Sequence, residues 1–291
     1  MANSILENDY LVATFKAEGA ELTSVRRKVD NQECIWQADP AVWARHAPIL
    51  FPIVGRLKGD QYQVNEAVYS MGQHGFARDQ SFSLVDQSST EITFGLTASP
   101  ETQKVYPFNF VLDIRYTLRE DELNVAYQVI NRDQAVMPFS IGAHPAFYCP
   151  AQQEQQWEEY HLQFEKPETL DRHLLENGLR SGGTERLLTD KNVLPLHQKL
   201  FELDAIVFKD VKSNWVRIVR QSDGKPMVTV TFTGFPYLGI WQKVGADFYC
   251  IEPWYGIADA TNSSGDFMEK EGVQQLSPEE QFTTGYQIKF H

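Results

Sequence analysis

The sequence predicts an all-β protein built from antiparallel strands. Apolar and polar residues alternate over residues 108–118 and again over 123–129, and Glu120-Asp121-Glu122 separates the two runs. Alternation with a period of two is typical of strands that bury one face, and two such runs joined by a short polar segment predict a long β-hairpin. No window carries the i, i+3, i+4, i+7 apolar stripe of a long amphipathic helix, which disfavours parallel strands joined by crossover helices.

Shorter runs with the same alternation extend this prediction along the chain. They cover residues 11–15, 22–29, 62–71, 82–96 with a break at Ser88-Ser89, 215–219, 228–232 after an Asp223-Gly224 turn, and 286–290. Many antiparallel strands at hairpin spacing predict two packed sheets or a barrel. The polar segments 152–156 and 179–188 are expected to be long connections, because strand patterns resume on both sides of each. We therefore expect one domain over residues 1–291.

Composition and charge exclude several classes of function. The 291 residues include 26 basic and 39 acidic ones, and the formal net charge of −13 disfavours nucleic acid and favours a small neutral or locally neutralised ligand. Cys34, Cys149 and Cys250 have no Cys-x-x-Cys spacing, so reduced buried thiols are expected. No signal-peptide pattern or membrane-length apolar run occurs, so we expect a cytoplasmic protein without a membrane partner.

The segment Cys250-Ile251-Glu252-Pro253-Trp254-Tyr255-Gly256 places one carboxylate in an apolar strand. Glu is rarely buried without a partner or a task, and Pro253 is expected to end the hydrogen-bonding ladder beside Glu252. An edge residue turned to solvent is the plainer alternative. Aromatic rings beside a carboxylate are suited to hold a sugar ring. The aromatic residues of this region are Tyr237, Trp241, Phe248, Trp254 and Tyr255.

A histidine is the second candidate. His144 lies in Phe139-Ser140-Ile141-Gly142-Ala143-His144-Pro145-Ala146-Phe147-Tyr148, and the following proline favours extended backbone at this position. The small residues around it leave the room that a pocket wall needs. A core histidine whose hydrogen bonds are satisfied is the alternative.

Two further segments carry cationic candidates. Gln73-His74-Gly75-Phe76-Ala77-Arg78-Asp79 contains a second histidine and an arginine, and a tight turn would direct both to one side. Alternatively, Arg78 pairs with Asp79 and holds the turn. Arg56 follows a long apolar run and Gly55, without the glycine pattern of a phosphate loop.

Several chemistries lack their motifs. The sequence has no Gly-x-Ser-x-Gly elbow and no His-Glu-x-x-His pair, which leaves serine-hydrolase and zinc-peptidase functions without support. His46, His74 and His144 have no spacing that fixes them on one face as metal ligands. We expect neither a metal nor another cofactor.

Five motifs together resemble the aldose 1-epimerase family, the galactose mutarotases, over nearly the whole chain, and most closely its shorter bacterial branch. They are Gly55-Arg56, His74-Gly75-Phe76-Ala77-Arg78-Asp79, Ala143-His144-Pro145-Ala146-Phe147, Leu203-Asp204-Ala205-Ile206-Val207-Phe208 and Ile251-Glu252-Pro253-Trp254-Tyr255-Gly256. The resemblance implies a large antiparallel β-sandwich with its site on a concave sheet face. It also implies that Glu252 is the general base and His144 the general acid. The residues implied to bind sugar hydroxyls are Arg56, His74 and Asp204.

The chemistry of mutarotation fits one carboxylate and one imidazole. Opening a hemiacetal removes the proton on O1 and protonates the ring oxygen, so it needs a base and an acid but no nucleophile, metal or redox cofactor. We expect Glu252 to keep an ordinary pKa and to be ionised at neutral pH, with His144 partly protonated beside it. Trp254 is expected to contribute to the sugar site.

Two alternatives remain open at this point. Arg78 suits a phosphate group, so a hexose-6-phosphate epimerase competes with an epimerase for a free hexose. A non-catalytic sugar-binding sandwich is the alternative from another class. It would not need to keep both Glu252 and His144.

Overall fold

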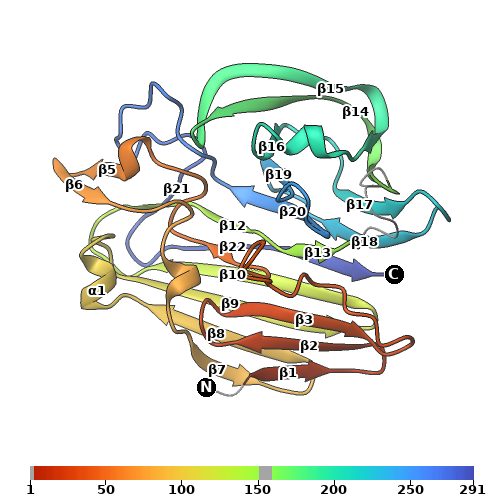
Figure 1. Cartoon of the computed structure of the whole chain (residues 1–291). Helices are drawn as coiled ribbons and strands as arrows, with labels where there is room; N and C mark the ends of the chain where they lie inside the picture. The colour runs from red at the N-terminus through yellow and green to blue at the C-terminus, as the bar shows by residue number, and fades with distance from the viewer. Residues whose placement is uncertain (1–2, 151–158) are drawn as a thin grey trace.

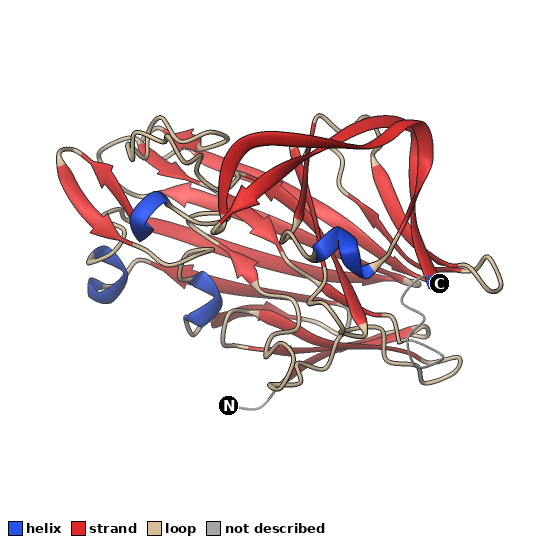
Figure 2. Ribbon diagram, turned by 45° about the horizontal axis from the view of Figure 1, so that its top comes forward, coloured by secondary structure: helices blue, strands red, loops and turns tan. Residues whose placement is uncertain are grey.

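The computed structural model describes residues 3–150 and 159–291 and shows a large antiparallel β-sandwich, as expected from the sequence (Figures 1 and 2). Between the named strands, every pairing in the described residues is antiparallel. Helices are short. They are the α-helix α1 (Pro100–Gln103) and the 3-10 turns Lys58–Asp60, Ala77–Asp79 and Gln198–Phe201. None of the described helices has the length and apolar character needed to cross a membrane.

One sheet runs through most of the molecule. From edge to edge its strands are β4 (Ile49–Leu50), β12 (Ile141–Ala143), β20 (Phe248–Tyr255), β19 (Tyr237–Trp241), β16 (Ile206–Lys209), β14 (Tyr160–Glu176), β17 (Trp215–Arg220), β18 (Pro226–Thr231), β22 (Gln281–Phe290), β10 (Glu122–Asn131), β9 (Phe110–Arg119), β8 (Glu91–Thr97) and β7 (Ser83–Gln87), while β13 (Ala146–Tyr148) pairs with β20 and β15 (Leu179–Pro195) with β14. Three smaller sheets complete the fold. The first has the strand order β1 (Ser4–Glu7), β2 (Leu11–Lys16) and β3 (Glu21–Arg27). The second pairs β5 (Gln61–Val64) with β6 (Ala67–Ser70), and the third pairs β11 (Met137–Phe139) with β21 (Gln274–Leu276).

The predicted hairpin is confirmed as β9 and β10, which pair along their whole length. Its inward residues pack against the sheet formed by β1, β2 and β3, which lies across β8 and β9 in Figure 1. The ring of Phe15 on β2 is 4.6 Å from that of Tyr116 on β9, and the Tyr116 hydroxyl donates to the carbonyl of Ala20 at 2.8 Å. This contact joins the two layers of this half of the sandwich, and its apolar burial is the main stabilising term there.

Two strand predictions are wrong. Residues 179–188, expected to be a connection, belong to β15, which pairs with β14 through several register shifts. Most side chains of β15 are exposed on both faces, so the strand has no apolar alternation to reveal it. The run 62–71 is a hairpin rather than one strand, because Asn65 and Glu66 adopt left-handed φ values of 48° and 64° and turn the chain. The other expected connection, 152–156, lies outside the described residues.

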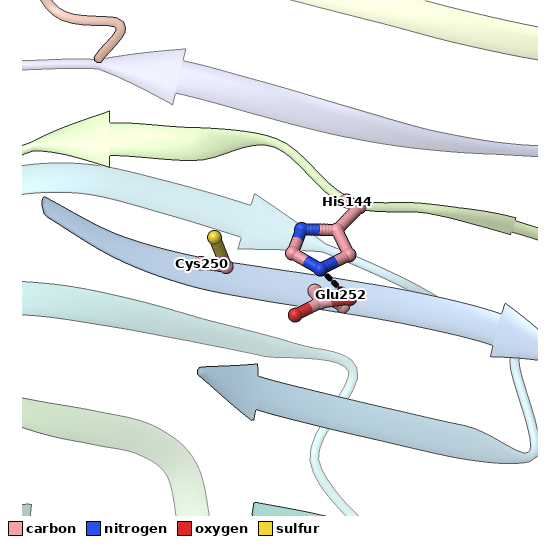
Figure 3. A group of neighbouring side chains, drawn as sticks. All are labelled: His144, Cys250 and Glu252. Carbon is pink, nitrogen blue, oxygen red and sulfur yellow. Dashed lines mark ion pairs between the residues drawn. The ribbon is translucent and has the colours of Figure 1, made fainter. Parts of the chain in front are cut away.

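An interruption in the ladder brings two candidate residues together. Glu252 lies inside β20 rather than at its end, so the expectation that Pro253 ends the strand is wrong. On one side of β20, Ala146 pairs with Cys250 and Gly142 pairs with Trp254. Continuing this antiparallel register places His144, which lies between β12 and β13, opposite Glu252. Directly opposed residues project to the same face of a sheet, and Figure 3 shows the two side chains meeting there.

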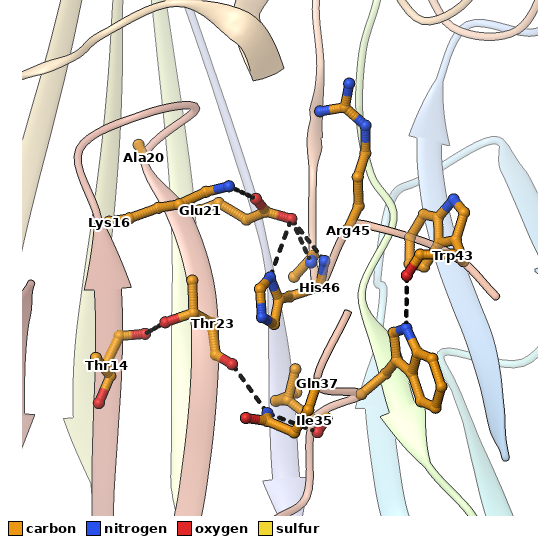
Figure 4. A network of polar contacts seen from close by, with 12 residues as sticks. Thr14, Lys16, Ala20, Glu21, Thr23, Ile35, Gln37, Trp43, Arg45 and His46 are labelled. Carbon is orange, nitrogen blue, oxygen red and sulfur yellow. Dashed lines mark hydrogen bonds and ion pairs between the residues drawn. The ribbon is translucent and has the colours of Figure 1, made fainter. Parts of the chain in front are cut away.

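The segment 36–48 crosses this region without forming a strand, and a buried carboxylate anchors it (Figure 4). Glu21 is 1% exposed, and its Oε1 accepts hydrogen bonds from the backbone N–H groups of His46 and Ala47 at 2.8 and 2.9 Å. Its Oε2 lies 2.6 Å from Nζ of Lys16. The His46 carbonyl in turn accepts from the N–H of Ala146, so the segment is tied both to the small sheet and to β13.

We expect Glu21→Ala to lower the free energy of unfolding by about 1.5–3 kcal/mol, the range for hydrogen bonds to a charged group. The variant leaves the two backbone N–H groups without their acceptor. Chemical denaturation measures the change, and Glu7→Ala is the matched control. Glu7 also pairs with a lysine, Lys28 at 2.5 Å, but the pair is exposed and should contribute at most about 1 kcal/mol. Equal losses in the two variants would show that Glu21 is not an anchor.

Candidate active site

A pocket of about 250 Å³ lies over the interruption between β12 and β13. Its size suits a small molecule rather than a polymer. It is lined by Trp43, Gly55, Gln73, His74, Arg78, His144, Leu175, Gly178, Asp204, Ala205, Val207, Trp241, Glu252, Trp254 and Ala258. Six of the seven residues predicted from the sequence are therefore brought together, and Arg56 is the exception.

Glu252 and His144 form the centre of the site. Glu252 is 1% exposed and His144 is 8% exposed, and Nε2 of the imidazole lies 3.3 Å from Oε2 of the carboxyl group. Among the described residues, Nδ1 of His144 and Oε1 of Glu252 are buried without a hydrogen-bond partner, and Oε2 has only its contact with the imidazole. Such atoms are costly unless a ligand or proton transfer uses them.

Aromatic rings exclude water from this pair. The indole of Trp43 stacks on the imidazole of His144 with ring centroids 5.1 Å apart and an interplanar angle of 28°. Trp241 meets the same imidazole edge-on at 5.5 Å. The burial of the imidazole therefore depends on the segment that Glu21 anchors, because that segment carries Trp43.

Burial shifts both pKa values toward the neutral forms. It raises the pKa of Glu252 well above its usual range, and the nearby charge of Asp204 adds to the rise. It lowers the pKa of His144 to about 3, and the positive charges of Arg78 and Arg45 act in the same direction. The expectations that Glu252 keeps an ordinary pKa and that His144 is partly protonated at neutral pH are therefore both wrong. The pair holds one proton over a wide pH range, and the neutral imidazole beside a protonated carboxyl is the favoured form.

His74 faces the same space from the opposite wall. Its Nδ1 accepts a hydrogen bond from the N–H of Gly55 at 3.2 Å, and its ring lies 5.6 Å from that of His144. Burial holds the pKa of His74 well below its usual range, so the ring is neutral. A neutral ring that accepts at Nδ1 carries its proton on Nε2. His74 therefore has one N–H free to donate.

Arg78 reaches the pocket, and its pairing with Asp79 is weak. Its Nη2 donates to the carbonyl of Gln73 at 2.7 Å, whereas its Nε lies 3.8 Å from Asp79 and has no hydrogen-bond partner although it is buried. Arg45 takes the Asp79 carboxylate instead, at 2.8 Å. The guanidinium thus keeps one donor that no described residue uses, and burial together with Arg45 lowers the pKa of Arg78, while Asp79 and Glu21 act in the opposite direction.

Asp204 and Arg56 differ in where the structure places them. Asp204 lines the pocket, and its Oδ1 accepts from the N–H of Ala205 at 2.8 Å. Arg56 is turned away from the pocket. Its Nε and Nη2 donate to Asp60, each at 2.8 Å, and its Nη1 donates to the carbonyl of Asn177 at 3.3 Å. Arg56 therefore stabilises the turn between β14 and β15, whose Gly178 forms part of the wall.

Trp254 forms the floor because two glycines leave space for its ring. A Cβ atom on Gly239 would lie 2.4 Å from the indole, and one on Gly142 would lie 2.6 Å from it. The indole N–H donates to the carbonyl of Ala143 at 3.2 Å, which fixes the ring in the plane of the floor. The glycines of β12 and β19 thus determine where an apolar ring face is presented to a ligand.

No sequence pattern pointed to Trp43, to Gln73, or to Leu175 and Gly178 near the turn between β14 and β15. Trp43 lies in an irregular segment without periodicity, so no pattern pointed to it. Gln73 precedes His74 and lines the pocket through the same turn. A tryptophan in a polar segment is a usable signal, because burying so large a ring usually requires a site or a core.

Known proteins resemble this chain over nearly all of its length. The family model described as Aldose 1-epimerase matches residues 4–275. Protein LacX (plasmid) of Lactococcus lactis subsp. lactis is 33% identical over 97% of each chain.

Solved structures agree. The galactose mutarotase related enzyme from Lactobacillus acidophilus superposes with a TM-score of 0.95 at 33% identity, over 100% of this chain and 97% of that one. A galactose mutarotase-like protein from Lactobacillus casei gives 0.95 at 32% identity over 100% of both chains. The family model covers most of the chain, and the relatives are similar to it in both sequence and fold. The chain therefore belongs to the aldose 1-epimerase family.

Proposed function

We propose that this protein is a mutarotase that interconverts the α and β anomers of a hexose. The observation that carries the proposal is the His144–Glu252 contact of 3.3 Å in a small pocket that Trp254 also lines. Ring opening requires a base and an acid that exchange roles when the ring closes. A carboxyl group and an imidazole that share one proton meet this requirement.

The proton moves between known atoms in this proposal. Glu252 takes the proton from O1 while His144 donates one to the ring oxygen, and rotation about the C1–C2 bond exposes the other face of the aldehyde before the ring closes. The reactive form has an ionised carboxylate and an imidazolium. This reactive form differs from the favoured neutral pair only by the position of one proton along the Nε2–Oε2 contact. Burial therefore leaves the reactive form accessible by transfer of that one proton.

The other pocket residues suit the binding of a sugar. The floor of Trp254 offers an apolar face to the C–H groups of the ring. His74 can donate one hydrogen bond from Nε2, and Asp204 can accept hydrogen bonds from hydroxyl groups. These groups surround the reacting pair without competing for its proton.

A hexose 6-phosphate is a second candidate substrate, and Arg78 favours it. The buried Nε of this residue has no hydrogen-bond partner, and the carboxylate next to it in sequence is paired with Arg45. Arginine binds phosphate through its planar fork of donors. A local positive charge in a chain of net charge −13 would be needed to hold an anionic sugar.

We expect Glu252→Gln to lower the rate of anomer exchange by at least about 100-fold, because the amide cannot take the O1 proton. Sugar binding should be largely retained, because the shape is unchanged. Exchange spectroscopy by NMR on a panel of hexoses and hexose 6-phosphates measures the rate above the spontaneous one.

Glu168→Gln is the matched control for loss of a buried carboxylate. Glu168 is 1% exposed and binds Ser213 away from the pocket, so exchange should persist. A Glu252→Gln rate within a few-fold of wild type would exclude Glu252 as the base. Wild-type protein that binds sugars without accelerating exchange would instead be a non-catalytic carbohydrate-binding protein.

We expect a broad bell-shaped dependence of kcat/KM on pH. The pKa of His144 is lowered to about 3, so the pair gains a second proton, and activity falls, only near that pH rather than near 6.5. The pKa of Glu252 is raised, so the last proton is lost, and the alkaline limb begins, only above the ordinary carboxyl value of 4.5. The measurement is kcat/KM as a function of pH, over the pH range in which circular dichroism shows that the protein is folded. An acid limb at pH 4.5 would contradict the shifted pKa values of the two residues.

We also expect His144→Asn to remove most of the activity.

We expect Arg78→Ala to weaken binding of a hexose 6-phosphate by about 1.5–3 kcal/mol and to change binding of the free hexose little. The control is Arg56→Ala, which removes a guanidinium already engaged by Asp60 and should leave the ratio of the two affinities unchanged. Calorimetric titration with both ligands gives the ratio. Equal losses for both ligands in Arg78→Ala would mean that Arg78 only holds the turn and that the substrate is neutral.

A further inference from the structure

A buried thiol lies beside the reacting pair. Cys250 precedes Glu252 by two residues on β20, so both side chains project to the same face, and Ala146 of β13 pairs with it. One donor atom each from His144, Cys250 and Glu252 lie within 4.8 Å of one another, and Figure 3 shows the sulfur, the imidazole and the carboxyl group on one side of β20. Proton transfer in the proposed reaction does not use the thiol.

The unpartnered atoms of this cluster point to a ligand. Within the part of the chain that the structure describes, Nδ1 of His144 and Oε1 of Glu252 have no hydrogen-bond partner, although both residues are at least nine-tenths buried. His144 and Glu252 also line the pocket, which gives an ion a path from solvent and leaves one coordination position open. Three protein ligands with one open position are typical of an exchangeable zinc site.

We propose that His144, Cys250 and Glu252 form a binding site for Zn²⁺ and for Co²⁺ of similar geometry, and that metal bound there blocks the acid–base pair. Nitrogen, sulfur and oxygen donors together select these borderline ions over Mg²⁺ and Ca²⁺, which prefer oxygen alone. Bond lengths of about 2.0–2.3 Å require the donors to move toward the ion by roughly 1 Å or less. The thiol binds as a thiolate and Glu252 binds as a carboxylate, so the thiol proton and the proton shared by Glu252 and His144 are both released to water.

The consequence is reversible inhibition. An ion on Glu252 and His144 occupies the lone pairs that would take the O1 proton and carry the acidic proton, so the occupied protein cannot catalyse exchange. This consequence rests on the proposed function, whereas binding of the ion does not. The two can therefore be tested separately.

Cobalt spectroscopy tests binding without any turnover. Titration of the metal-free full-length chain with Co²⁺ should produce the near-ultraviolet thiolate-to-cobalt band and the visible bands of a four-coordinate site. Cys250→Ser should lack the thiolate band and bind Zn²⁺ at least about 10-fold more weakly in competition with a chromogenic chelator. Cys149→Ser is the matched control, because Cys149 is also a buried free thiol but lies outside the cluster, and it should behave as wild type.

The outcomes separate the two proposals. A thiolate band that persists in Cys250→Ser, or equal Zn²⁺ affinity in Cys250→Ser and wild type, overturns the site. Cys250→Ala replaces the serine variant if that variant does not fold. If wild type exchanges anomers, Zn²⁺ should inhibit it, EDTA should restore the rate, and Cys250→Ser should need at least about 10-fold more Zn²⁺ for the same inhibition. A wild type with the cobalt band but no exchange activity would support the metal site and sink the mutarotase proposal instead.

Discussion

Keeping a carboxyl group and an imidazole side by side and out of water is the constraint on which the site depends. A continuous ladder beside β20 would hold every backbone group and leave little freedom at His144. The break between β12 and β13 removes that restriction at one residue, while the pairs on both sides of it keep the register. The backbone of His144 thus departs from the ladder inside a rigid sheet, while Trp43 and Trp241 hold its imidazole in the position that proton transfer needs.

The charges around the pair act in one direction. The negative charge of Asp204 raises the pKa of Glu252. The positive charges of Arg78 and Arg45 lower the pKa of His144. Both effects move the shared proton from the imidazole to the carboxyl group. A substrate that forms hydrogen bonds with these residues changes the field that they produce. Binding can thereby alter the position of the proton before any bond in the sugar breaks.

The sequence predicted the fold well where one face of a strand is buried. The hairpin of β9 and β10 has inward residues that alternate along its length, and its pattern was clear. β15 was missed because its side chains are mostly solvated, so only backbone hydrogen bonds define it. The turn at Asn65 and Glu66 was missed because left-handed φ values leave no hydrophobic signature.

The candidate site was predicted only in part, because local motifs are visible in the sequence but contacts between distant segments are not. Motifs in single strands and turns pointed to Glu252, His144 and His74, and these do share a pocket. The pKa values could not be predicted, because burial of the pair depends on Trp43, which lies far away in sequence. Arg56 was assigned by motif alone, and its side chain is committed to Asp60, a partner four residues on that no motif includes.

The two glycines beneath Trp254 have a consequence for the shape of the pocket. Both glycines lie behind the indole, on the side that faces away from a ligand. Each glycine is so close to the ring that any side chain at its position must displace the ring. A methyl group at position 239 would push the floor toward the opposite wall and shrink the cavity. The size of the pocket is therefore set in part by two residues that do not line it, from behind the aromatic surface that does.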